Sequence, residues 1–158
     1  STLWNPKLLV IDEPTSALDV TSQKRMIKSL LDLKQAGIIE SMLYISHDIS
    51  SLRQLCDRCA IMYCGKMVET GDMDDIINNP LHPYTRGLIY SVVSYDPKGR
   101  RKGGLECIPG EHPDLRNPPP GCRFHPRCPY AMDICKTREP LVIKATKGKR
   151  EVSCWLYE

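Results

Sequence analysis

Two short apolar runs, each followed at once by polar residues, constrain the fold of this chain more than any other feature. The first covers residues 8–11 (LLVI) and ends at an acidic pair, and the second covers residues 42–45 (MLYI) and ends at residues 46–48 (SHD). Unbroken apolar runs of this length are typical of parallel strands that are buried on both faces. The sequence therefore predicts two buried strands whose ends carry polar side chains.

The segment between these runs predicts a helix. Over residues 20–36 the apolar side chains Ile27, Leu30 and Leu31 recur at helical spacing, and Gly37 stands where a left-handed C-terminal cap is expected. Strand, helix and strand in this order predict a right-handed βαβ unit and an α/β fold. Both polar clusters then lie at the carboxyl ends of parallel strands, where open α/β sheets bind their ligands.

Shorter elements are expected after the second strand. They are a helix over residues 50–55, a hairpin over residues 60–69 around Gly65, a helix that Asp72 caps and that runs to about Asn79, and a helix over residues 84–93. From Asp96 to Gly121 the chain is rich in Pro, Gly and charge, which favours a linker or an irregular segment held by a ligand.

Length and composition allow one domain, or a small domain with an appendage. The 158 residues include 22 Lys and Arg against 19 Asp and Glu, and a net charge of +3 gives no indication of a nucleic-acid surface. The chain has neither the ~20 consecutive apolar residues of a membrane helix nor a signal-peptide pattern, which favours a cytosolic protein. It begins at Ser1 without an initiator Met, so a processed or truncated start is expected.

The acidic pair Asp12 and Glu13 predicts a magnesium and phosphoryl-transfer site. The negative charge of a carboxylate at the end of a buried strand must be balanced, and a bound Mg²⁺ would supply the opposite charge. In phosphoryl-transfer sites a strand-end Asp holds Mg²⁺ and a neighbouring group orients or deprotonates the attacking water. Asp12 fits the first role and Glu13 the second. The alternative is that residues 12–15 form only a polar turn and a helix cap.

Two motifs resemble those of ABC ATPases. LLVIDEPTSALDV (residues 8–20) resembles the Walker B and D-loop block, and YISHD (residues 44–48) resembles the H-loop. The resemblance implies a partial P-loop NTPase sheet that binds ATP and Mg²⁺. It further implies the following roles: Asp12 as the Mg²⁺ residue, Glu13 as the catalytic carboxylate, Ser16 and Asp19 in the D-loop that meets a partner ATPase subunit at the nucleotide, and His47 as the switch histidine that contacts the γ-phosphate.

Other parts of the ATPase pattern do not occur in this sequence. It contains no G-x-x-x-x-G-K-[ST] phosphate-binding loop, and the family's Q-loop and LSGGQ signature are also missing. Backbone amides and a lysine of that loop form the primary site for the β- and γ-phosphates. The chain by itself is therefore expected neither to bind ATP well nor to hydrolyse it, and the activity is expected of a full-length parent.

The second half of the chain resembles a particular branch of this family. Residues 79–88 (NPLHPYTRGL), 108–110 (IPG) and 119–129 (PPGCRFHPRCP) resemble the C-terminal extension of oligopeptide, dipeptide and nickel importer subunits. The resemblance implies an ATPase part over residues 1–79 and an extension over residues 80–158. It also implies a peripheral subunit at the cytoplasmic face of the membrane, with a second ATPase subunit, two permease subunits and an extracytoplasmic solute-binding protein as partners. The solute that the resemblance implies is a peptide or, alternatively, nickel.

The extension is expected to be irregular and cysteine-rich, and four of its cysteines indicate a ligand site. In some members of the resembled family, cysteines at matching intervals ligate a [4Fe-4S] cluster, which implies this role for Cys122, Cys128, Cys135 and Cys154. Zinc, a disulfide pairing and an empty site are the alternatives, although zinc usually prefers closer cysteine pairs. A cluster- or zinc-binding regulatory module without catalysis is the competing function. No RNP, KH or C₂H₂ pattern occurs, so nucleic acid is not expected as a partner.

The other cysteines carry no predicted ligand role. Cys56, Cys59 and Cys64 are expected to be buried structural thiols, although Cys56 and Cys59 have a C-x-x-C spacing. Cys107 lies outside the pattern of the tail and is left unassigned.

Overall fold

A computed structural model describes residues 6–93, 108–145 and 149–158 of the chain. These residues form two compact units, one that ends at Asp57 and one that begins at Arg58. Within the described residues, no helix combines the length and the apolar character that crossing a membrane would need.

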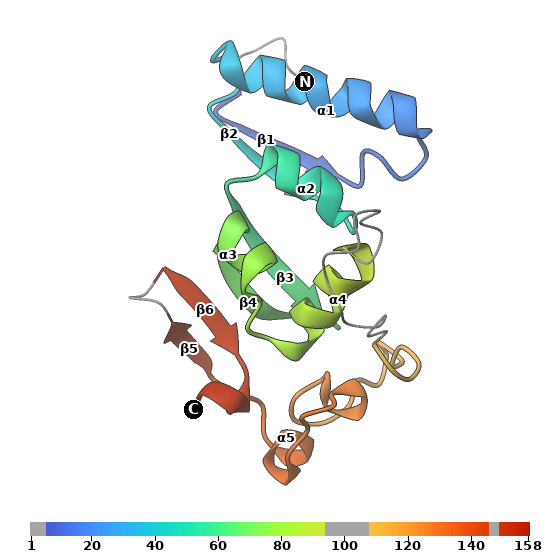
Figure 1. Ribbon diagram of the computed structural model, residues 1–158, viewed down its shortest axis with the longest axis vertical. Coiled ribbons are helices and arrows are strands. Elements are labelled where there is room, and N and C mark those ends of the chain that lie inside the picture. The colour runs from blue at the N-terminus through green and yellow to red at the C-terminus, as the bar shows by residue number, and fades with distance from the viewer. Residues whose placement is uncertain (1–5, 94–107, 146–148) are drawn as a thin grey trace. The chain divides into compact units, whose positions relative to one another are not determined.

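The first unit contains the predicted strand–helix–strand arrangement (Figure 1). Strand β1 (Leu8–Asp12) pairs in parallel with β2 (Ser41–Ile45), with Leu8 opposite Ser41 and Asp12 opposite Ile45. Helix α1 (Val20–Gln35) connects them, and α2 (Ile49–Leu55) follows β2. The parallel pairing confirms the βαβ prediction.

Helix α1 begins and ends where the sequence predicts. The Asp19 carboxylate accepts hydrogen bonds from the amides of Thr21 at 2.9 Å and Ser22 at 3.0 Å, and so caps the helix. After the helix, Gly37 adopts a φ of 69°, the left-handed conformation that glycine takes without steric cost. The side chains of Ile27 and Leu30 are buried.

The two strands are buried on only one face, which differs from the prediction. Tyr44 is buried and the side chains of Leu9, Ile11 and Met42 are half-buried, whereas alternate residues on the other face are exposed. The exposed apolar side chains are Leu8, Val10, Leu43 and Ile45. The described residues of the first unit supply no element that covers this face. An apolar run in the sequence indicates that a strand will be buried, but it does not show which segment packs against the strand.

The second unit is built on the predicted hairpin. Strand β3 (Arg58–Tyr63) pairs antiparallel with β4 (Lys66–Asp72), and the two turn residues, Cys64 and Gly65, have φ values of 48° and 76°. A two-residue turn with positive φ at both positions matches the twist of the strands that it joins. The hairpin prediction is thus confirmed, with the glycine where the turn requires it.

Helices α3 (Met73–Asn78) and α4 (Pro83–Val93) follow the hairpin. Asp72 precedes α3 at the capping position, but its side chain makes no capping hydrogen bond. The prediction of the helix is confirmed, and that of a side-chain cap is wrong.

The C-terminal part is less irregular than predicted. It contains a 3₁₀ turn η2 (His125–Arg127), α5 (Asp133–Thr137), strands β5 (Val142–Ala145) and β6 (Arg150–Ser153), and a last turn η4 (Trp155–Tyr157). Strand β6 pairs with β4, which gives a four-stranded sheet of order β3-β4-β6-β5. The prediction of a wholly irregular extension needs this correction, because two of its segments complete the sheet. The boundary at residues 79 and 80, drawn from the resemblance, stays a prediction.

A buried polar network joins this sheet to the segment before α4. Both oxygens of the Glu69 carboxylate accept amide hydrogen bonds, from Leu81 and from His82, each at 2.9 Å. The Arg150 guanidinium bonds to the same carboxylate and to the carbonyl oxygen of Asn79. Near the C-terminus, the Tyr157 hydroxyl donates to the carbonyl oxygen of Leu81 at 2.9 Å. The last residues of the chain are therefore fixed to the hairpin through residues 79–82.

Candidate functional site

The end of β1 brings Glu13 beside the end of β2. The Glu13 amide donates to the carbonyl oxygen of Ile45 at 2.9 Å, so the parallel pairing continues one residue beyond β1. Glu13 has a φ of 42°, in the left-handed region that residues other than glycine rarely adopt. This backbone conformation turns the chain out of the strand while its amide remains bonded to the sheet.

His47 contacts the carboxylate of Glu13. Its Nδ1 lies 3.1 Å from Oε1, with hydrogen-bond geometry, and 2.9 Å from Oε2, where the angles do not make a hydrogen bond. We regard Oε1 as the bonded atom, since direction and distance both count in a hydrogen bond. Glu13 Oε2 is buried and has no hydrogen-bond partner within the described residues. The hydrogen bond between these two residues thus uses Oε1 of the carboxylate.

Asp12, Ser16 and Asp19 lie close to Glu13 in the sequence but have different structural positions. Asp12 ends β1 with an exposed side chain. The Ser16 hydroxyl donates to the carbonyl oxygen of Glu13 at 2.9 Å, and so braces the backbone of the acidic residue. Hydrogen bonds from Ser22, together with one from the Thr21 amide, hold the pKa of Asp19 below its usual range. The structure thus places Ser16 against Glu13, whereas Asp19 serves as the cap of α1.

Gln23 also contacts this loop, although no sequence motif singled it out. From the first turns of α1, its side-chain Nε2 donates to the carbonyl oxygens of Thr15 at 3.2 Å and Leu18 at 3.0 Å. A glutamine in an amphipathic helix gives no sequence signal of such a role, because glutamine is common on exposed helix faces.

The four tail cysteines converge in the second unit. They lie in a loop at Cys122, after η2 at Cys128, in α5 at Cys135 and before η4 at Cys154, and none of them forms a disulfide. The amide of Cys122 donates to the carbonyl oxygen of Cys135 at 2.9 Å. Burial and, to a smaller extent, the other three thiols raise the pKa of the Cys154 thiol to about 11. That mutual influence indicates that the four sulfur atoms are neighbours.

The arrangement does not fit a single metal ion. Over residues 6–93, 108–145 and 149–158, no group of three or more His, Cys, Asp or Glu side chains is placed to hold one. An iron–sulfur cluster sets its thiolate ligands farther apart than a single ion does, since several irons lie between them. Four thiols are the number that a [4Fe-4S] cluster takes.

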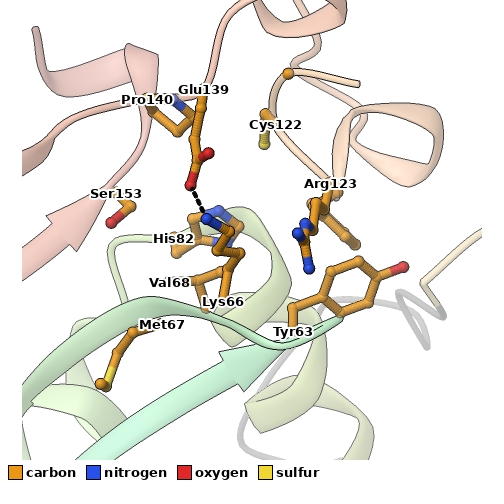
Figure 2. Close-up of a pocket in the computed structure, with 12 residues that line it drawn as sticks. Tyr63, Lys66, Met67, Val68, His82, Cys122, Arg123, Glu139, Pro140 and Ser153 are labelled. Atoms are coloured by element: carbon orange, nitrogen blue, oxygen red, sulfur yellow. Dashed lines mark ion pairs between the residues drawn. The ribbon is translucent and has the colours of Figure 1, made fainter. Parts of the chain in front are cut away.

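Cys122 also lines a pocket in the second unit (Figure 2). The pocket includes the ion pair of Lys66 with Glu139, whose atoms lie 2.8 Å apart, and the buried ring of His82. The Nδ1 atom of His82 accepts a hydrogen bond from the Tyr84 amide at 3.0 Å. Burial lowers the pKa of His82 to about 4, so its ring is neutral near pH 7.

The cysteines outside the tail cluster depart somewhat from expectation. Cys56, Cys59 and Cys64 are half-buried and not fully buried. Cys107 lies outside the described residues.

Comparison with known proteins gives one family. The model of the C-terminal region of oligopeptide/dipeptide transporters matches residues 68–135. The dipeptide transport ATP-binding protein DppD of Caldanaerobacter subterraneus is 46% identical over 156 residues, which are 99% of this chain and 46% of that protein. The oligopeptide transport ATP-binding proteins AppD and OppD of Bacillus subtilis are 46% and 44% identical, over 98% and 96% of this chain.

The similarity is continuous along this chain but covers only part of each relative. The chain spans about half the length of the curated relatives it matches, from 41% to 46% of those named above. Both the first unit and the cysteine tail are included, because the aligned residues cover nearly the whole chain. Along nearly its whole length, the chain is therefore similar to ATP-binding proteins of oligopeptide and dipeptide transport.

Proposed function

We propose that this chain acts within an ATP-hydrolysing subunit that energises the import of oligopeptides or dipeptides, with nickel as the alternative solute. The observation that carries the proposal is the contact between Glu13 and His47 at the ends of two parallel strands. The names of the relatives, which are ATP-binding proteins of peptide transport, support the same activity.

The residues at this edge of the sheet divide the chemistry among them. Asp12, exposed at the end of β1, would hold Mg²⁺, which when bound neutralises charge on the nucleotide phosphates. Glu13 would accept a hydrogen bond from the attacking water, and so orient that water. His47 uses Nδ1 to contact Glu13, which leaves Nε2 for the γ-phosphate.

The proposal places the phosphate cradle outside these residues. The sequence has no G-x-x-x-x-G-K-[ST] loop, so these residues alone are expected to bind ATP weakly. We propose that the loop of Ser16 and Asp19 faces a second ATPase subunit. The complex would include two permease subunits and a solute-binding protein, with this subunit peripheral at the cytoplasmic face of the membrane.

Replacing Glu13 with Gln in the whole natural protein tests the proposal. The amide keeps the size of the carboxylate but removes the base, so we expect ATP turnover to fall by on the order of 10²-fold or more while nucleotide binding persists. Glu40→Gln, at an exposed residue of the same unit, is the matched control. Normal turnover in Glu13→Gln would remove this residue from the proposed role.

We propose separately that Cys122, Cys128, Cys135 and Cys154 hold a [4Fe-4S] cluster. The support is the convergence of four thiols that form no disulfide, since four is the number of thiolates that such a cluster takes. Bound as thiolates, they would cross-link the loop at Cys122, α5 and the C-terminal turn.

Anaerobic purification followed by visible absorption spectra and iron and sulfide analysis tests the cluster. We expect about four irons per chain, lost in Cys122→Ser and retained in the control Cys56→Ser. Zinc in place of iron, or no metal after anaerobic purification, would contradict the cluster while leaving the ATPase proposal standing.

A further inference from the structure

Gln23 bridges two backbone carbonyls of the loop that joins β1 to α1. Its Nε2 donates to Thr15 at 3.2 Å and to Leu18 at 3.0 Å. A side-chain amide nitrogen has two hydrogens, and these two bonds use both. The half-buried glutamine therefore spans the loop from buried Thr15 to exposed Leu18.

The loop consists of two successive turns that meet at Thr15. In the first turn the Ser16 amide and hydroxyl both donate to the carbonyl oxygen of Glu13, at 3.3 and 2.9 Å. In the second turn the Leu18 amide donates to the carbonyl oxygen of Thr15 at 3.1 Å. Because Gln23 donates to the same Thr15 oxygen, the second turn is tied directly to helix α1.

These bonds serve the loop and not the start of the helix. The first amides of α1, those of Thr21 and Ser22, are already bonded to the Asp19 carboxylate. The helix is therefore capped without any contribution from the glutamine side chain. The two carbonyls that Gln23 binds lie before the helix. They belong to the loop that we propose faces a second ATPase subunit.

A continuous set of contacts connects Gln23 with the acidic site. Gln23 holds Thr15, the adjoining Ser16 braces the Glu13 carbonyl, and the Glu13 carboxylate bonds to His47. Glu13 already has a positive φ, so its side-chain direction depends on how the following turn is held. A shift of the second turn would move both the carboxylate and the exposed Ser16.

We propose that Gln23 is a positioning residue for ATP hydrolysis: it fixes the loop at residues 15–18 so that Glu13 and Ser16 keep their places during turnover. This inference rests on the proposed ATPase function. Gln23 does not touch the reacting atoms in this role, and it acts through the loop backbone.

Replacing Gln23 with Ala in the whole natural protein, assembled with its transport partners, is the first test. We expect kcat to fall between about 10-fold and 10²-fold, the scale of a misplaced reacting group, while the nucleotide Kd and the melting temperature stay close to those of the unmodified protein. Gln54→Ala is the matched control, because Gln54 Nε2 donates to the Ser50 carbonyl within its own helix, at 3.0 Å. That variant should retain full turnover.

Gln23→Glu allows a measurement, the pH dependence of turnover, that a change in helix stability alone would not affect. An ionised carboxylate has the same shape but no hydrogen to donate, and it would face two carbonyl oxygens. Turnover should be as low as in Gln23→Ala near pH 8, and its ratio to the unmodified protein should rise toward about pH 5, where protonation restores one donor.

The outcomes separate this inference from the proposed function. If Glu13→Gln abolishes turnover but Gln23→Ala behaves like Gln54→Ala, the positioning role is wrong and the ATPase proposal stands. A loss in Gln23→Ala that only matches a loss of folded protein also overturns the positioning role. If Glu13→Gln itself turns over normally, the proposed function fails first, and this inference fails with it.

Discussion

Arg150 Nη2 lies 2.5 Å from Oε1 of Glu69, and both side chains are almost completely buried, at 2% and 0% exposure. The carboxylate also accepts the amides of Leu81 and His82, so it bonds to three partners from two separate segments of the chain. A buried charge pair of this kind depends on both members, because removing one leaves the other uncompensated.

Replacing Glu69 with Gln is expected to lower the free energy of unfolding by about 3–5 kcal/mol, since Arg150 would then be buried without a counter-charge. Chemical denaturation of the whole natural protein measures this change. Lys66→Ala, which breaks the exposed pair with Glu139, is the control and should cost less than about 1 kcal/mol. Equal effects of the two variants would contradict a stabilising role for the buried pair.

The buried ring of His82 predicts a pH dependence of stability. Burial lowers its pKa from 6.5 to about 4 against the opposing effect of Glu69, so the unfolded state takes up a proton that the folded state does not. The stability that the neutral His82 ring contributes is therefore complete above the pKa of the unfolded state. It is lost as the pH falls toward the pKa of the folded state. Over that range, the free energy of unfolding should decrease by up to about 1.4 kcal/mol per pH unit from this residue.

His82→Asn is the variant that isolates this effect, because its amide oxygen can still accept the Tyr84 amide. The charged groups around the ring, Glu69 and the pocket residues Lys66, Arg123 and Glu139, remain in place in that variant. Denaturation curves between about pH 7.5 and pH 4.5 should show a shallower pH slope in His82→Asn. An identical slope in both proteins would assign the pH dependence to other residues.

Gly121 is expected to tolerate no side chain. A Cβ there would lie 2.4 Å from the Cys135 carbonyl oxygen and 2.9 Å from the Thr137 amide nitrogen, at a φ of 66°. Gly121→Ala should lower stability by about 1–3 kcal/mol and reduce iron content if the cluster forms. Gly37→Ala has a similar φ of 69° but no atom within 4 Å, so it should cost less than Gly121→Ala and leave the iron content unchanged.

The capping role of Asp19 predicts a difference between two aspartates. Asp19→Ala removes the Oδ1 atom that accepts the amides of both Thr21 and Ser22, and should cost about 1 kcal/mol. Asp72→Ala, at the start of α3, should cost less, because its side chain caps no amide. Thermal unfolding of both variants measures the difference, and a larger effect of Asp72→Ala would contradict the assignment of the cap.

The elements that the sequence predicted correctly have local causes. The parallel pair β1–β2 follows from two apolar runs separated by a helical segment, and the hairpin follows from the glycine at its turn. The proximity of Glu13 and His47 follows from the same topology, since the ends of paired parallel strands lie side by side. The roles of these residues, and those of Asp12, Ser16 and Asp19 toward a nucleotide, stay predictions.

The features that sequence could not predict depend on distant partners. Strands β5 and β6 are four residues each, and they join the sheet because β6 pairs with β4 and β5 pairs with β6. Glu69 and Arg150 look like exposed charges in the sequence, because the alternation of the strands does not show which face a tail will cover. The Gln23 contacts could not be predicted either, because backbone carbonyl acceptors have no sequence signature.

The left-handed backbone at Glu13 lowers stability at the position of a residue with a proposed catalytic role. A glycine would adopt a φ of 42° without steric cost, whereas the glutamate holds it at a cost of about 1 kcal/mol or more. Glu13→Gly should therefore raise the melting temperature while it eliminates hydrolysis, and measuring both on one preparation checks this. Laboratory selection for heat resistance alone would favour such a variant, and would yield a sturdier protein without the proposed catalytic carboxylate.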